Sequence, residues 1–364
     1  MSEAEVTRQG PRGEKPGREA VPGEGQRTAP SPQPGNGRQR GSGARRWRRG
    51  RRAEQPMVPK AEFTSYYGKS ILNPPVWEAR DIAGYLFLGG LAGGSSLLAA
   101  GADLTGRPGL SRAAKTAAAA AGAVSVAALV HDLGRPARFI NMMRVFKVTS
   151  PMSVGSWLLG GYVPAAGVAA FTALTGRLPW LGRAATAGAA VLGPAVAAYT
   201  AALISDTAVP AWHDGYREMP FVFTGSGAMA AGGLGLLAAQ ADESGPARNL
   251  ALLGQVLEMT AFERMTRRMG LVAEPYRTGR GGAYIRAGQV LGALGATGAA
   301  LTGTPLLPAG RARRIVAVAS GAALIGASAA TRWGIFHAGM ASARDPKYTV
   351  VPQRERLGRK AVAR

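Results

Sequence analysis

The amino-acid sequence predicts an all-α protein, a polytopic integral membrane bundle of about eight transmembrane helices. Two observations predict this fold. After residue 80 the chain consists of apolar stretches about 20 residues long, the length needed to cross a bilayer. Its charged residues gather instead in the tails and in short connections between those stretches. The whole-chain mean hydropathy of +0.01 therefore averages two very different kinds of segment.

Eight stretches are long enough to cross a hydrocarbon core about 30 Å thick. In chain order they are about 81–103, 113–131, 152–174, 184–205, 221–239, 247–265, 283–303 and 314–337. The hydrophobic signal is weakest in the second stretch, which is short, and in the sixth, which is interrupted by charged residues.

Glycine and alanine dominate these stretches, as in GGLAGG (Gly89–Gly94) and GSGAMAAGG (Gly225–Gly233). Small residues at helical spacing let membrane helices approach each other closely, so we expect helix–helix packing there. The rival fold is a soluble, alanine-rich bundle. It requires amphipathic stripes with charged outer faces, and most of the stretches lack them.

The predicted membrane domain, residues 81–338, lies between polar segments. Residues 1–56 are rich in Gly, Pro, Gln and Arg and are predicted to be disordered. Residues 57–80 form a pre-helix segment, and 339–364 form a basic C-terminal tail. The cluster RRWRRGRR (Arg45–Arg52) is typical of a nucleic-acid arm or of a segment attracted to anionic lipid, and its position before a membrane domain favours lipid over nucleic acid.

The distribution of positive charge predicts the orientation. The formal net charge is +23, and an even number of spans puts both termini on one side of the membrane. The basic residues of the loops are almost evenly divided between the two sides. The two tails, however, lie on the same side and add many Lys and Arg residues to it. The positive-inside rule then predicts a plasma-membrane protein with both termini in the cytoplasm.

Composition and motifs exclude several kinds of chemistry. The chain has no cysteine, so it has no disulfide and ligates no iron–sulfur cluster by thiolates. A pair of b-type haems needs four histidines on both membrane faces, whereas this chain has three, all predicted at one face. The sequence contains no P-loop, dinucleotide-binding or HExxH motif. We therefore expect no haem and no metal bound by this chain.

Polar residues gather where several helices are predicted to reach the side of the termini. The stretch LVHDLGRPARFINMMRVF begins at the end of the second helix, and WEARD precedes the first. The residues concerned are Trp77, Asp81, His131, Asp132, Tyr199 and Asp206. Taken singly, each has a simpler explanation: an interfacial tryptophan, a helix-capping aspartate or a hydrogen-bonded rim histidine. Their convergence on one face favours a functional site.

Glu258 lies deeper, near the middle of the sixth stretch, with Gln255 one turn earlier on the same helix face. An ionisable side chain at that depth costs about 2.5–3.5 kcal/mol on insertion scales, so it usually faces the bundle interior. It is a candidate proton relay or ligand contact. An internal ion pair with an arginine, or a shallower helix, are the alternatives.

Three sequence blocks resemble the NrfD/PsrC family, the membrane subunits of polysulfide-reductase-type oxidoreductases. The blocks are PPVWEARDIAGYLFLGGLAGGSSLLAAGADL, LVHDLGRPARFINMMRVFKVTSPMSVGSW and AAYTAALISDTAVPAW. With the eight-span pattern, the resemblance covers about residues 70–340. Neither tail belongs to the pattern.

The resemblance implies a quinone-reactive membrane anchor without a redox cofactor of its own. It implies a ferredoxin-like iron–sulfur subunit docked on the membrane face and a molybdopterin catalytic subunit beyond it, as in polysulfide reductase or formate-dehydrogenase-like complexes. Menaquinone is then a bound substrate, and this chain is not catalytic alone.

The resemblance also implies roles for particular residues. Tyr199 matches the family's quinone-pocket tyrosine, with Trp77, Asp81 and Tyr85 as the facing wall. His131 then hydrogen-bonds the quinone and, with Asp132, exchanges protons at the rim. Asp206 and Glu258 are further candidate proton carriers, chosen from their position in the sequence and not from the resemblance.

Two other functions stay open from the sequence. A secondary transporter is expected to have an internal repeat with Gly- or Pro-broken helices, and no convincing repeat is seen between the halves. A purely structural anchor for a redox complex is expected to tolerate replacement of Tyr199, His131 and Glu258.

Overall fold

The structure is a computed structural model that describes residues 6–7, 10–11, 71–132 and 137–362. The chain divides into two compact units, residues 1–71 and 72–364. In the first unit, the strands β1 (Val6–Thr7) and β2 (Gly10–Pro11) pair antiparallel, with Val6 opposite Pro11. The rest of the tail predicted to be disordered, including its arginine cluster, lies outside the described residues.

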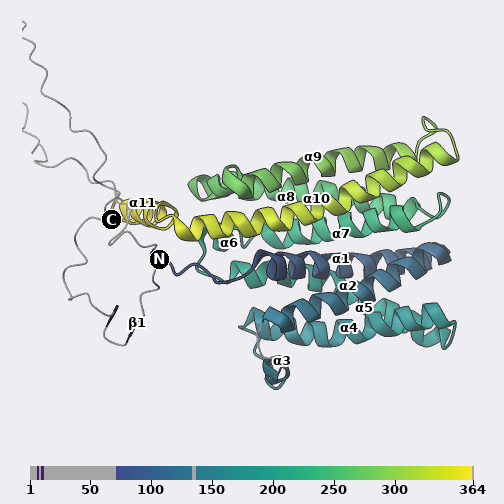
Figure 1. Cartoon of the computed structure of the whole chain (residues 1–364), viewed down its shortest axis with the longest axis horizontal. Helices are drawn as coiled ribbons and strands as arrows, with labels where there is room; N and C mark the ends of the chain where they lie inside the picture. Colours follow the sequence, from purple (N-terminus) through teal and green to yellow (C-terminus); the bar gives the residue numbers. More distant parts are fainter. Residues whose placement is uncertain (1–5, 8–9, 12–70, 133–136, 363–364) are drawn as a thin grey trace, which may run out of the picture. The chain divides into compact units, whose positions relative to one another are not determined.

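The second unit contains eight helices of 20 residues or more within its described part, as the sequence predicts (Figure 1). They are α1 (Ala79–Leu104), α2 (Pro108–Asp132), α4 (Pro151–Thr175), α5 (Pro179–Ser205), α7 (Met219–Ala238), α8 (Gly245–Met269), α9 (Gly279–Thr302) and α10 (Arg311–Arg344). The shorter elements are α3 (Ala137–Met142), α6 (Pro210–His213), the 3₁₀ helix η4 (Gly270–Tyr276) and α11 (Lys347–Val362).

Proline and glycine set several of the helix boundaries. Helices α4, α5, α7 and α8 each have a proline at one of their first two positions, and α2 begins at Pro108. A proline there is favourable because its missing N–H has no partner in the first turn of a helix anyway. Gly176 follows α4 with a φ of +70°, the left-handed conformation that closes many helices.

The long helices form two groups of four. Helices α1, α2, α4 and α5 pack around one another as the first bundle, and α7, α8, α9 and α10 pack in the same order as the second bundle. Contacts of α1 with α7, α1 with α10 and α5 with α7 join the two bundles. A repeated arrangement is therefore present in the packing, although the sequence shows no convincing repeat between the halves.

Glycines permit the closest helix contacts. A Cβ on Gly93 of α1 would overlap the carbonyl oxygen of Gly193 in α5. A Cβ on Gly227 of α7 would lie 2.6 Å from the carbonyl oxygen of Gly90 in α1. The small-residue stretches of α1 and α7 thus serve the packing that the sequence predicts for them.

Six helices in the described part of the chain are long and apolar enough to cross a membrane, namely α1, α2, α4, α5, α7 and α10. The second predicted span, corresponding to α2, meets this criterion in spite of its weak signal, whereas α8 and α9 do not. Large apolar side chains such as Val191, Leu253 and Leu294 are more than 60% exposed on the outer helices. Such a surface suits lipid and argues against the soluble bundle.

Candidate functional site

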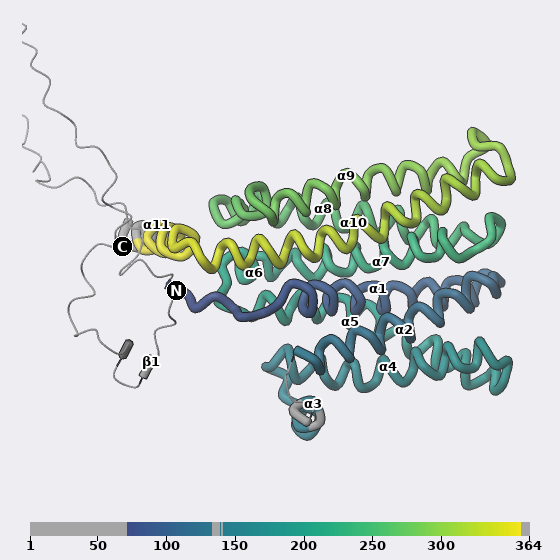
Figure 2. The backbone as a smooth tube through the Cα atoms, viewed as in Figure 1, coloured from purple at the N-terminus to yellow at the C-terminus, as the bar shows by residue number. Residues whose placement is uncertain are grey.

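One end of the second unit gathers the predicted site residues. The helices alternate in direction, so α1, α4, α7 and α9 begin at this end, and α2, α5, α8 and α10 finish there (Figure 2). We call it the terminal end, because α1 begins and α10 ends there. His131 at the end of α2, His213 in α6 and His337 near the end of α10 all lie at it, as the sequence predicts.

Two tyrosines meet between α1 and α5. The hydroxyl groups of Tyr85 and Tyr199 are hydrogen-bonded to each other, and the two residues are 2% and 9% exposed. The ring of Tyr199 lies against Gly155 of α4, where any Cβ would overlap it. The ring of Tyr199 therefore fits only because α4 has a glycine at this position.

An acidic–imidazole pair lies one turn nearer to the terminal end of α1. The Oδ2 atom of Asp81 is 3.3 Å from Nδ1 of His131, whose side chain is 78% exposed. Asp132 follows directly and interacts electrostatically with Asp81, His131 and Glu78. Asp81 and Tyr85 are four residues apart on one helix, so the acid–imidazole pair and the tyrosine pair lie on the same face of α1.

Trp77 and Trp212 connect the segment before α1 to the loop between α5 and α7. Their rings are stacked, and Nε1 of Trp212 donates a hydrogen bond to the carbonyl oxygen of Ile335 in α10 at 2.8 Å. Tyr276 of η4 donates from its hydroxyl to the carbonyl oxygen of Ala211 at 2.8 Å. Trp212 is fully buried, so it is not an interfacial-belt residue.

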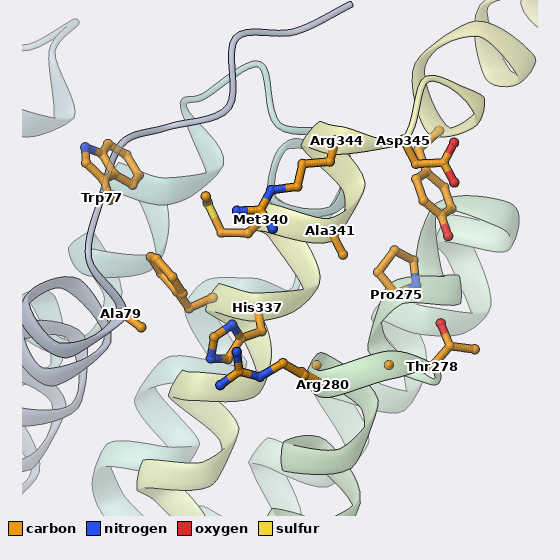
Figure 3. Close-up of a pocket in the computed structure, with 14 residues that line it drawn as sticks. Trp77, Ala79, Pro275, Thr278, Arg280, His337, Met340, Ala341, Arg344 and Asp345 are labelled. Atoms are coloured by element: carbon orange, nitrogen blue, oxygen red, sulfur yellow. The ribbon is translucent and has the colours of Figure 1, made fainter. Parts of the chain in front are cut away.

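A cavity of about 450 Å³ opens beside Trp77, between the start of α1, the start of α9 and the end of α10 (Figure 3). Arg280, His337 and Arg344 line it together with Asp345. The ring of His337 stacks on that of Tyr284, with centroids 5.5 Å apart. Sequence reasoning did not select the two arginines, since their only signal was the general excess of positive charge on this side.

Ion pairs hold the loops of the terminal end together. Nη2 of Arg268 is 2.5 Å from Oε2 of Glu218, and this hydrogen-bonded partner lowers the pKa of the Glu218 carboxyl below its usual range. Nζ of Lys347 is 3.0 Å from Oε2 of Glu274, and its hydrogen bond lowers the pKa of Glu274. The loop before α7 and the start of α11 are thereby tied to α8 and η4.

Asp206 and Glu258, two of the predicted proton carriers, lie apart from the Tyr85–Tyr199 pair and the Asp81–His131 pair. Asp206 is exposed and lines a different cavity of about 390 Å³, with His213, Asp214 and Arg356 among its neighbours. Glu258 belongs to the second bundle and is 7% exposed. It is buried, as expected from its depth in the sequence.

Arg332 of α10 is a buried cation that sequence reasoning missed. It is fully buried, its guanidinium carbon lies 3.8 Å from the ring centroid of Phe223, and its Nη2 donates to the carbonyl oxygen of Phe223 at 2.7 Å. Its Nε donates to the carbonyl oxygen of Leu86, the residue after Tyr85. Its electrostatic partner is Glu258. An arginine within an apolar stretch was the signal that could have revealed it.

The packed apolar helices and the polar terminal end define an integral membrane helical bundle. Residues 71–342 match the family described as "Polysulphide reductase, NrfD", which covers well over half of the chain. The chain therefore belongs to the NrfD family of membrane proteins, whose members anchor oxidoreductase complexes. A search of curated proteins found no match.

Within the described residues, no group of three or more His, Cys, Asp or Glu side chains is arranged to hold a metal ion. NrfD proteins are associated with quinone and with iron–sulfur and molybdopterin subunits.

Proposed function

We propose that this chain is the quinone-reactive membrane anchor of a multi-subunit oxidoreductase, and that it exchanges protons and electrons between menaquinone and an iron–sulfur partner subunit. One observation carries the proposal. A face of α1 holds a hydroxyl pair, Tyr85 with Tyr199, and an acid–imidazole pair, Asp81 with His131, a single turn apart.

The residues present suit a quinone ring. A hydroxyl group both donates and accepts, so Tyr199 can accept a hydrogen bond from Tyr85 while its own O–H donates to a ring oxygen. His131 supplies a second polar group for the opposite oxygen. Ile82, Leu86 and Leu129 belong to the same buried cluster as the two tyrosines and provide the kind of apolar surface that a ring and an isoprenoid tail require.

The proposed route of the protons follows from which side chains are exposed to water. Reduction of a bound quinone to quinol takes up two electrons and two protons, and oxidation releases them. His131 is largely exposed, so its imidazole can exchange protons with water at the terminal end. Asp81 holds this imidazole in place, and Asp132 is the adjacent acceptor. We assign proton exchange to these three residues rather than to Asp206 or Glu258.

The electrons come from or go to a partner. A ferredoxin-like iron–sulfur subunit docked on the terminal end, with a molybdopterin subunit beyond it, would complete a polysulfide reductase-like or formate-dehydrogenase-like complex. Trp77 lies at the surface that such a partner would cover. From the charge of the tails, this face belongs to the cytoplasmic side of the cell membrane.

Displacement of a quinone-site inhibitor tests the proposal. The probe is a menaquinone analogue, and the protein is the purified full chain. The Tyr199→Phe variant should bind the analogue roughly five- to tenfold more weakly, because one hydrogen bond is worth about 1 kcal/mol.

The matched control is Tyr162→Phe. Tyr162 is another buried tyrosine of the first bundle and lies two turns of α4 beyond Gly155. Its hydroxyl is hydrogen-bonded to that of Ser96 at 2.8 Å. Equal losses in the two variants, or unchanged binding in Tyr199→Phe, would contradict a quinone site at this tyrosine.

A further inference from the structure

A third cavity lies in the second bundle, between α8, α9 and α10. It has a volume of about 310 Å³. Its walls include Gln255, Glu258, Met259, Phe262, Gln289 and Thr331. The tyrosine pair, by contrast, lies between α1 and α5 of the first bundle. The cavity is therefore a separate site.

The inner wall of this cavity is rich in hydrogen-bond acceptors. Glu258 is 7% exposed, and its carboxyl has the hydroxyls of Thr331 and Ser226 as hydrogen-bond partners. Gln255 lies three residues earlier on the same face of α8 and also lines the cavity. Its amide packs against Gly292 of α9, and its Oε1 atom is buried without any hydrogen-bond partner. A buried acceptor without a donor is unfavourable, so this wall is suited to a ligand that brings O–H or N–H groups.

The cavity lies beside the middle of α8. Glu258 is 11 residues before the end of α8 at Met269, which places it about 16 Å from that end at a rise of 1.5 Å per residue. Met259 at the rim is 56% exposed, and the neighbouring Val256 and Val290 are exposed to similar extents. Glu263 and Gln289 are also part of the lining, so a ligand that approaches past Met259 from the lipid meets polar side chains inside the cavity.

We propose that this cavity is a second site, which binds the hydroquinone headgroup of a membrane quinol. A hydroquinone has two O–H donors on an apolar ring, and it matches the carboxylate of Glu258 and the unpartnered oxygen of Gln255. The oxidised quinone has only acceptors at those positions, so it binds here more weakly. A volume near 300 Å³ is at the lower end for small-molecule sites and suits a ring whose tail stays in the lipid.

The identity of the ligand, though not the existence of the cavity, rests on the proposed function. Arg332 of α10 is the electrostatic partner of Glu258.

Equilibrium binding of dimethylnaphthohydroquinone to the full chain in lipid nanodiscs tests the proposal. The wild type should bind two equivalents of the reduced probe and one of the oxidised dimethylnaphthoquinone. The Gln255→Leu variant should bind only one equivalent of the reduced probe. This variant should still fold, because it replaces an acceptor that has no partner.

A control on the same helix is Thr260→Val, an exposed residue whose hydroxyl bonds only to carbonyl groups of its own helix. It should keep both equivalents. One equivalent of reduced probe in the wild type, or two in Gln255→Leu, would overturn the second site. If Tyr199→Phe keeps all binding while Gln255→Leu loses one equivalent, the second site stands and the tyrosine site fails.

Discussion

The indole rings of Trp77 and Trp212 stack with their centroids 5.8 Å apart and their planes 18° from parallel. This contact joins the segment that enters α1 to the loop that links the two bundles. The further hydrogen bond from Trp212 to Ile335 extends the connection to α10. The geometry of the terminal end therefore depends on one buried indole.

Replacement of Trp212 by alanine should destabilise the protein strongly. The change leaves a cavity at a fully buried site and removes the indole hydrogen bond, a loss of about 3–5 kcal/mol. Thermal unfolding in detergent measures it. Trp180, which is 65% exposed, is the control, and Trp180→Ala should leave the unfolding temperature almost unchanged.

A methyl group at Gly93 should push α1 away from α5. Gly93→Ala places its Cβ on the carbonyl oxygen of Gly193 and should cost about 1–3 kcal/mol through overpacking. Gly101→Ala on the same helix meets no atom within 4 Å and should be neutral or slightly stabilising. Equal unfolding temperatures for the two variants would contradict the close helix contact.

Acidification should weaken the loop before α7 through Glu218. The pKa of this carboxyl is lowered in the folded state, chiefly by its hydrogen bond from Arg268. Its stabilising contribution is therefore present above the ordinary carboxyl pKa of about 4.3 and is lost as the pH falls through the lowered folded value. Stability should drop between about pH 5 and pH 3.

The Glu218→Gln variant isolates this effect. It should be less stable than the wild type at neutral pH and should lose less stability on acidification. Limited proteolysis of the α5–α7 loop as a function of pH provides the measurement. Parallel pH profiles for the two proteins would show that Glu218 does not carry the dependence.

Asp81 and Asp206 provide a matched pair for proton exchange. Asp81→Asn removes the carboxylate beside His131 and should slow quinol turnover by the assembled complex several-fold, with little change in KM. Asp206→Asn alters an exposed residue of a different cavity and should not slow turnover. If Asp206→Asn is the slower variant, the proton route passes through the other cavity.

Much of this fold is predictable because lipid imposes simple demands on sequence. Long apolar stretches bounded by proline, glycine and charge mark the helices, and most boundaries agree within a few residues. α10 is an exception, since it continues past the predicted end at residue 337 to Arg344. These boundaries are set by the sequence of each segment and do not depend on which other helices it packs against.

The site was harder to predict because it depends on pairs of residues distant in sequence. The convergence of Asp81 with His131 and of Tyr85 with Tyr199 follows from the alternating direction of the helices. The burial of Trp212, and the contact of Arg332 with backbone groups of both α1 and α7, depend on how the two bundles dock. The hydrophobic pattern of a single helix does not predict how the two bundles pack against each other.

The most direct test of the central claim is photolabelling with an azido-quinone, followed by mapping of the labelled peptides. We predict that label displaced by unlabelled menaquinone lies on α1 and α5, near Tyr85 and Tyr199. Displaceable label confined to other helices, or none on a folded chain, would contradict a quinone site at this tyrosine pair.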